Sequence, residues 1–162
     1  TEKSHGPWYY QQTSLGFNYR MTDVEAALGL SQLDKLEVFL EKRNALAAHY
    51  DKLFSECKDI TPLKQNADGY SSYHLYVVRI DSLTDKQHAD LVTNLRGQGI
   101  FAHVHYIPIH MQPYYKNLGF KKGDFPNAET YYQQAITLPL FPDLTFEQVE
   151  FVVEKLSVEI NN

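Results

Sequence analysis

The strongest pattern in the chain is helical and covers most of its first third. Between Val24 and Phe54, apolar residues recur every three or four positions with charged residues between them, which is typical of an amphipathic helix. The segment Thr22–Glu25 matches a capping box, in which each of the two side chains accepts a hydrogen bond from the other residue's backbone N–H. The pattern predicts one long helix, straight or bent, from Thr22 to about residue 56.

Two further capping boxes predict later helices. Thr84–Gln87 begins a helical stripe that stops at Gly97-Gln98-Gly99, where glycine is the usual residue beyond a helix C-terminus. Thr145–Gln148 begins the last helix of the chain. Pro126 suits the first turn of another helix, because its missing N–H would have no helical partner there.

Three shorter runs are typical of β-strands. Residues 70–80 and 100–107 are rich in Tyr, Val and Ile, and residues 135–140 form a third run bounded by prolines. Residues 57–69 are polar and predict a loop. The element order predicts an α+β fold with a small, three-stranded, mainly antiparallel sheet, helices packed on one face and a long N-terminal helix.

Residues 1–21 show neither the helical nor the strand-like spacing of apolar residues. We therefore expect an irregular entry segment there and one folded domain over residues 22–162. The first residues lack an initiator Met and the plan of a signal peptide, which suggests sequence from the middle of a longer chain.

The 162 residues carry 20 acidic and 15 basic side chains, a net charge of −5, which disfavours nucleic acid and anionic membranes as partners. No apolar stretch approaches the roughly 18 residues of a membrane span, and the single Cys57 cannot close an internal disulfide. We therefore expect a cytoplasmic protein.

Three histidines are the candidate metal ligands. His103 and His105 lie two residues apart on a predicted strand and so on one face, and His110 follows in a proline-bounded loop. Three imidazoles could bind zinc. No HExxH motif or cysteine pair accompanies them, so histidines that contact a ligand or make structural hydrogen bonds are the alternative, and we predict no metal site.

Two segments carry candidate binding groups. The loop from His105 to His110, with Tyr114 and Tyr115 after it, offers flat rings with polar tips that suit sugars and nucleobases, although tyrosines also simply fill cores. Residues 16–20 precede a predicted helix N-terminus, where an Asn, an Arg and free amides could hold an anion; a turn with an exposed Arg is the alternative. No nucleophile with a base and an orienting group stands out, so we predict no catalytic residue in this chain.

Several motifs resemble those of the DegT-type sugar aminotransferases, which depend on pyridoxal phosphate. They are Gly16-Phe17-Asn18-Tyr19-Arg20-Met21-Thr22-Asp23, Ser72-Tyr73-His74-Leu75-Tyr76, His105-Tyr106-Ile107-Pro108-Ile109-His110, Gly123-Asp124-Phe125-Pro126-Asn127-Ala128-Glu129 and Leu138-Pro139-Leu140-Phe141-Pro142. The resemblance covers nearly the whole chain. Within the family the chain is most similar to the enzymes that aminate the 4-keto group of a UDP-linked deoxy-N-acetyl hexose on the route to pseudaminic acid.

The resemblance implies the C-terminal domain of a fold-type-I aminotransferase, a homodimer whose two subunits share each active site. It implies that Asn18 reaches the cofactor phosphate of the neighbouring subunit, with Arg20 in support. It also implies that Tyr19, His105, Tyr106 and His110 contact the UDP-linked keto sugar and do not act as acid–base catalysts. His103 stands where relatives often carry a smaller amide.

The resemblance also implies what this chain lacks. In the family the Schiff-base lysine lies upstream, and the lysines here lie in polar, helical or loop contexts, whereas such a lysine needs an apolar or cationic setting. We therefore expect the chain alone to be inactive and its parent enzyme to take the amino group from glutamate. The alternative is a non-catalytic sugar-nucleotide-binding or regulatory module.

Overall fold

The computed structural model describes residues 6–7, 9, 11–17, 19–66, 68–81 and 83–161. The chain forms two compact units, residues 1–36 and residues 37–162. The domain boundary predicted at residues 21 and 22 stays a prediction. Within the described residues, no helix is long and apolar enough to cross a membrane.

The first unit contains the helix α1, Asp23–Leu33. The predicted capping box is confirmed: the Thr22 hydroxyl accepts from the Glu25 N–H, and the Glu25 carboxylate accepts from the Thr22 N–H at 2.8 Å. No residue of α1 is buried, although the helix carries several large apolar side chains. A helix with this composition is normally covered in the assembled protein.

The prediction of one helix to residue 56 is wrong, because a second helix, α2, begins at Leu36 and ends at Phe54. Between them the Lys35 N–H bonds to the Gln32 carbonyl, three residues back, at 3.1 Å. This tighter turn ends the α-helical ladder of α1. Neither glycine nor proline occurs at residues 33–36, so the periodic pattern runs through the break without a signal.

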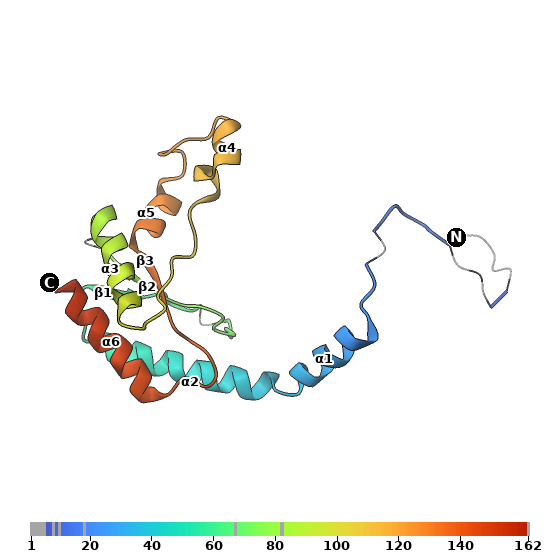
Figure 1. Ribbon diagram of the computed structural model, residues 1–162, viewed down its shortest axis with the longest axis horizontal. Helices are drawn as coiled ribbons and strands as arrows, with labels where there is room; N and C mark the ends of the chain where they lie inside the picture. Colours follow the sequence, from blue (N-terminus) through green and yellow to red (C-terminus); the bar gives the residue numbers. More distant parts are fainter. Residues whose placement is uncertain are drawn as a thin grey trace. The chain divides into compact units, whose positions relative to one another are not determined.

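The second unit is an α+β fold, as predicted (Figure 1). After α2 its elements are β1 (Ile60–Pro62), β2 (Tyr76–Ile80), α3 (Asp85–Gly97), a 3-10 turn (Ile109–Met111), α4 (Pro113–Asn117), α5 (Pro126–Gln134), β3 (Ala135–Leu138) and α6 (Phe146–Ile160). The three strands form an antiparallel sheet in the order β1-β2-β3. The capping boxes of α3 and α6 are present, and Pro126 occupies the first turn of α5.

The prediction of a strand at residues 100–107 is wrong, because no strand forms there. Only His103 pairs with β3, through two backbone hydrogen bonds with Thr137 of 3.0 and 2.7 Å. Beyond this pair, His105 meets Thr137 through its side chain instead of its backbone. The sheet is completed instead by β1, which lies inside the predicted loop 57–69 and is too short to show alternation.

The other two predicted strands are present but shorter. The strand predicted from residue 70 begins only at Tyr76. The third strand ends at Leu138, directly before Pro139, because proline cannot continue the ladder.

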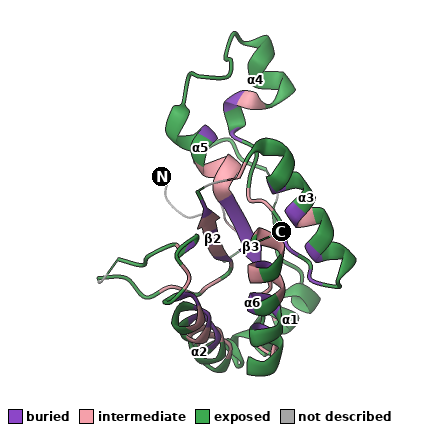
Figure 2. Ribbon diagram, turned by 90° about the vertical axis from the view of Figure 1, so that its left-hand side faces the viewer, coloured by how far each residue is buried: buried purple, intermediate pink, exposed green. Residues whose placement is uncertain are grey.

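The core lies between the sheet and three helices. Val78 of β2 stands opposite Ile136 of β3, and both are fully buried. They pack with buried apolar residues of α2, α3 and α6. Figure 2 shows this buried zone along β2 and β3, with exposed residues dominating α4. Because side chains alternate along a strand, Thr137 points to the face of β3 opposite Ile136.

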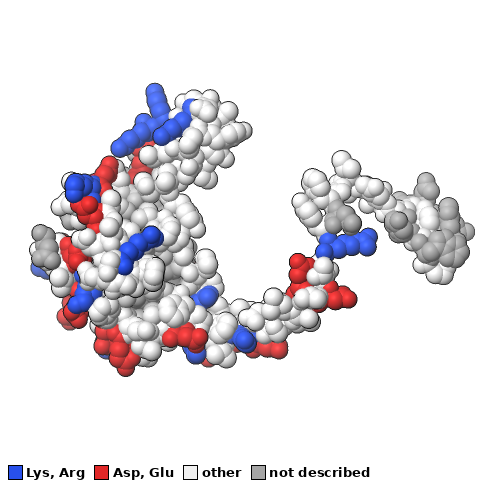
Figure 3. Space-filling view, in the orientation of Figure 1, with Lys and Arg blue, Asp and Glu red and all other residues white. Residues whose placement is uncertain are grey.

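The helices α2 and α6 lie side by side (Figure 1). His49 of α2 contacts the Glu150 carboxylate at 3.2 Å and the Phe146 ring at a centroid distance of 4.8 Å, both on α6. Acidic side chains gather over these two helices in Figure 3, the pattern of a solvent-facing helix pair.

Candidate functional site

Two histidines and a threonine form the centre of the candidate site. His105 Nδ1 lies 2.8 Å from the Thr137 hydroxyl oxygen. The His103 and His105 rings stack at a centroid distance of 4.4 Å with their planes inclined by 22°. The prediction that these two histidines share a face is therefore confirmed, although the segment is not a strand. Thr137 is buried and holds both residues, one through its backbone and one through its side chain.

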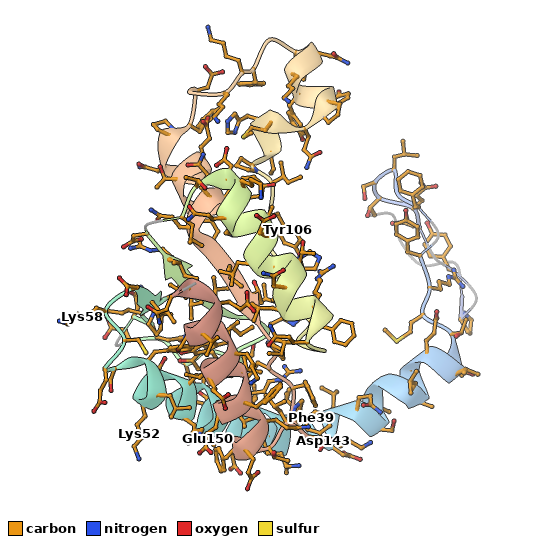
Figure 4. The ribbon with its side chains drawn as sticks, turned by 60° about the vertical axis from the view of Figure 1, so that its left-hand side comes forward. Phe39, Lys52, Lys58, Tyr106, Asp143 and Glu150 are labelled. Carbon is orange, nitrogen blue, oxygen red and sulfur yellow. The ribbon has the colours of Figure 1, made fainter. Side chains whose placement is uncertain are left out.

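Tyr106 extends this group toward solvent. Its side chain is 67% exposed, and its ring meets the His105 ring edge to face at a centroid distance of 4.5 Å. In Figure 4 Tyr106 lies well above Glu150 and Lys52, which mark the α6 and α2 side of the unit. An exposed aromatic ring beside an imidazole can stack on a sugar or a base and offers a polar tip.

The His105 imidazole is held in its neutral form near pH 7. Partial burial lowers the pKa of His105 below the ordinary value, and the nearby His103 and His74 lower it further because like charges repel. His105 is therefore suited to hydrogen bonding with a neutral group of a ligand. An ionic contact would require the protonated ring.

His110 belongs to a second, buried group. Its Nε2 lies 2.8 Å from the Glu129 Oε1, and the same oxygen accepts from the Gly123 N–H at 2.7 Å. Burial raises the pKa of Glu129, but hydrogen bonds from the Gly123 N–H and from His110 outweigh it, and the pKa is lowered overall. Glu129 is therefore a carboxylate at neutral pH, and His110 Nε2–H donates to it.

The turn before α5 builds this pair. Gly123 has a φ of +98°, a conformation that side chains with a Cβ rarely adopt, so glycine allows its N–H to point at Glu129. Pro126 opens α5 three residues before Glu129. The carboxylate thus lies in the first turn of the helix, where negative charge is favourable.

An apolar pocket of about 430 Å³ adjoins this pair. Its walls are Pro108, Ile109, His110, Tyr115, Phe120, Phe125 and Ala128. The His110 ring lies 4.9 Å from the Phe125 ring, centroid to centroid. The pocket lining therefore combines aromatic rings with two side chains that carry polar groups, His110 and Tyr115, a composition common in ligand sites.

The three histidines considered as metal ligands, His103, His105 and His110, do not converge on one point in the described structure. His110 is committed to Glu129, while His103 and His105 stack on each other. Across the described parts of the chain, no group of three or more His, Cys, Asp or Glu residues could hold a metal ion.

The predicted cofactor segment lies in the first unit. Asn18 falls outside the described residues, whereas Tyr19 and Arg20 are described and exposed. The Tyr19 ring stacks on Phe17 at a centroid distance of 5.4 Å. Arg20 therefore offers a solvent-accessible guanidinium two residues before the cap of α1.

The capping box limits what the N-terminus of α1 can bind. It uses the N–H groups of Thr22 and Glu25, which leaves those of Asp23 and Val24 without a partner in the described residues. The Thr22 N–H and hydroxyl lower the pKa of Glu25, so a negative charge lies in the same turn. Amides at a helix N-terminus and a guanidinium are groups that can bind phosphate, and of these Arg20 would supply the positive charge.

Sequence reasoning missed Gly123, Thr137 and Glu129 as parts of the site. Gly123 and Glu129 lie in one of the motifs that carry the family resemblance, and a glycine three residues before a helix-opening proline was the available signal. Nothing in the sequence pairs Thr137 with the histidines, because 32 residues separate it from His105.

The comparisons with known proteins point to one family. The model of the DegT/DnrJ/EryC1/StrS aminotransferase family matches residues 2–157. The chain is 38% identical over 155 residues to the spore coat polysaccharide biosynthesis protein SpsC of Bacillus subtilis, covering 93% of this chain and 40% of SpsC. It is 33% identical over 143 residues to the UDP-4-amino-4,6-dideoxy-N-acetyl-beta-L-altrosamine transaminase of Helicobacter pylori, covering 88% of this chain and 38% of that protein.

Solved structures agree with this match. Spr1654 of Streptococcus pneumoniae, assigned as a sugar aminotransferase and solved in apo, PMP and PLP forms, aligns with a TM-score of 0.87 at 32% identity, over 95% of this chain and 39% of Spr1654. PseC of Helicobacter pylori, an aminotransferase of pseudaminic acid biosynthesis, aligns with a TM-score of 0.85 at 30% identity, over 98% of this chain and 42% of PseC. The chain thus spans about two fifths of the length of these relatives. The family match over nearly the whole chain shows that it belongs to the DegT/DnrJ/EryC1/StrS family of sugar aminotransferases.

Proposed function

We propose that this chain is the C-terminal part of a pyridoxal-phosphate-dependent enzyme that transfers an amino group from glutamate to the 4-keto group of a UDP-linked deoxy sugar. The observation that carries the proposal is the loop from His105 to His110, which combines a neutral imidazole, an exposed Tyr106 and an apolar pocket within a family of sugar aminotransferases. The transaminase named for a UDP-linked amino sugar among the relatives supports the substrate class.

The residues of this chain bind and position. Asn18 and Arg20 would hold the cofactor phosphate of the neighbouring subunit, and Arg20 supplies a permanent positive charge. When bound, pyridoxal phosphate would supply the electron sink that amino transfer needs. Tyr19, His105 and Tyr106 would contact the nucleotide sugar, with His105 acting as an uncharged hydrogen-bond partner.

His110 would border the sugar without taking part in proton transfer. Its Nε2 proton is held by the Glu129 carboxylate, and the residue is 6% exposed. Its ring forms part of the pocket wall. We assign it the role of shaping that wall.

The isolated chain would be inactive, because no lysine in its described residues is buried in the apolar setting that a Schiff-base lysine needs. The complete enzyme would be a homodimer with a shared site. The uncovered apolar residues of the first unit support this assembly; they include Leu15, Phe17, Met21, Val24, Leu28, Leu30 and Leu33, each at least 61% exposed.

Replacing Asn18 tests the cofactor role directly. In the complete protein, Asn18→Ala is expected to weaken pyridoxal phosphate binding by about 1.5–3 kcal/mol, because it removes one hydrogen bond to a charged acceptor. Fluorescence titration of the cofactor-free protein measures this affinity. Asn66→Ala, in the exposed loop between β1 and β2, is the matched control and should bind normally. Equal affinity in the two variants would contradict the assignment.

A second experiment tests the dependence on the rest of the enzyme. We expect the isolated 162-residue chain to show no turnover with pyridoxal phosphate, glutamate and the UDP-linked 4-keto sugar. Turnover would contradict the proposal. Calorimetry of the isolated chain with the same nucleotide sugar distinguishes the proposal from the alternative function. A standalone binding or regulatory module would bind the sugar tightly without a partner chain.

A further inference from the structure

His103 has no role in the function proposed above, yet it is bound closely to His105. Its backbone N–H and carbonyl both bond to Thr137, and its ring covers the His105 ring at 4.4 Å. The side chain of His103 is itself exposed. The two backbone hydrogen bonds to the buried Thr137 fix the position of His103, and His103 in turn holds the ring that stacks on it.

We propose that His103 is a positioning residue for His105: it clamps the His105 ring against Thr137 and keeps it uncharged, so that His105 Nε2 meets the nucleotide sugar as a neutral hydrogen-bond partner. This inference rests on the proposed function, since it assumes that His105 contacts the sugar. It extends that function to His103, to which the proposed function assigns no role.

The orientation follows from the hydrogen bonds. His105 Nδ1 is committed to the Thr137 hydroxyl, and His105 Nε2 has no partner within the described residues. A ring turned by 180° about its Cβ–Cγ bond would place Cδ2 at the Thr137 hydroxyl and lose this hydrogen bond, while the stack on His103 fixes the plane of the ring. The free nitrogen is therefore the one available to a ligand.

The charge state follows from the groups that face His105. They are His103 on the same segment, His74 before β2, the uncharged Thr137 on β3 and the phenol of Tyr106. No ion pair links His105 to a carboxylate in the described structure, so nothing there favours the protonated ring, and two imidazoles disfavour it.

Histidine NMR on the full 162-residue chain tests the proposal without substrate. We expect the pKa of His105 to lie below the ordinary 6.5 and to move up toward it in His103→Phe. Phe keeps a stacked ring but cannot carry charge, so this variant isolates the electrostatic effect. His103→Asn should also raise the pKa and in addition lose the close contacts between the rings. His49→Gln, on α2 and paired with Glu150, is the control and should leave the His105 titration unchanged.

The pH profile of the complete enzyme supplies the second readout. His103→Phe should move the acid limb of kcat/KM for the nucleotide sugar to higher pH, which a purely structural role would not do. If the proposed function is wrong, neither protein turns over but the NMR difference remains. An ordinary pKa for His105 in the wild type, or the same pKa in wild type and His103→Phe, overturns the proposal.

Discussion

Tyr50→Ala is expected to lower the free energy of unfolding by about 3–5 kcal/mol, the range for truncating a buried aromatic side chain. Tyr50 of α2 is fully buried. Its ring stacks on Tyr76 of β2 at a centroid distance of 4.6 Å and on Phe54 at 6.0 Å. One side chain thus joins the long helix to the middle strand, and its removal leaves a cavity at their contact.

The phenol of Tyr50 adds a second link. It donates to the Pro139 carbonyl at 3.0 Å and so holds the chain directly after β3. Burial raises the pKa of Tyr50 well above its ordinary value, so the hydroxyl stays a donor throughout the neutral range. Tyr50→Phe is therefore the matched control, with an expected cost of about 1 kcal/mol for the hydrogen bond alone.

Urea denaturation of the three proteins measures both costs, because the transition midpoint reports stability when the slope is unchanged. The difference between the Ala and Phe variants isolates the ring from the hydroxyl. A cost for Tyr50→Ala no larger than that for Tyr50→Phe would show that the ring does not hold α2 to the sheet.

Local chemistry explains what could be predicted of the fold. The capping boxes at Thr22, Thr84 and Thr145 were readable because donor and acceptor lie within three residues of each other. The third strand was readable from its composition, although it was predicted to reach residue 140 and β3 ends at Leu138, before Pro139. The α+β class itself was predictable, because each element has its own periodicity.

Non-local pairing explains the errors. β1 is a strand because Ile60 pairs with Ile80, twenty residues later, and its own three residues carry no alternation. Residues 100–107 have strand-like composition, but only His103 finds a partner in the sheet. Composition describes a residue's preference for a strand and contains no information on whether a neighbouring strand is present.

The candidate site shows the same division. Spacing placed His103 and His105 on one face, and their rings do stack. Spacing could not show that His110 bonds to Glu129, nineteen residues away, or that Thr137 bonds to His105. His110 lies apart from the other two histidines in its bonding, because its partner Glu129 comes from α5 and the partner of His105 comes from β3.

The buried pair of His110 and Glu129 gives the second large effect. His110→Ala is expected to destabilise the chain by about 2–4 kcal/mol, because it removes a buried ring from the pocket wall and deprives the Glu129 carboxylate of one of its hydrogen-bond donors. In the complete enzyme the same change should raise KM for the nucleotide sugar, since the pocket loses part of its wall. Thermal unfolding and steady-state kinetics measure the two effects.

The pH dependence of stability distinguishes the charge of Glu129 from its packing. The pKa of Glu129 is lowered in the folded state, so its ionised form contributes stability above the ordinary value of 4.5, and that contribution is lost as pH falls from 4.5 through the folded-state pKa. Glu129→Gln keeps the shape of the side chain and cannot ionise. Wild type should therefore lose stability more steeply than Glu129→Gln below pH 4.5, and the two proteins should approach each other in acid. Parallel profiles from pH 7 to pH 3 would show that the carboxylate charge contributes nothing to the fold.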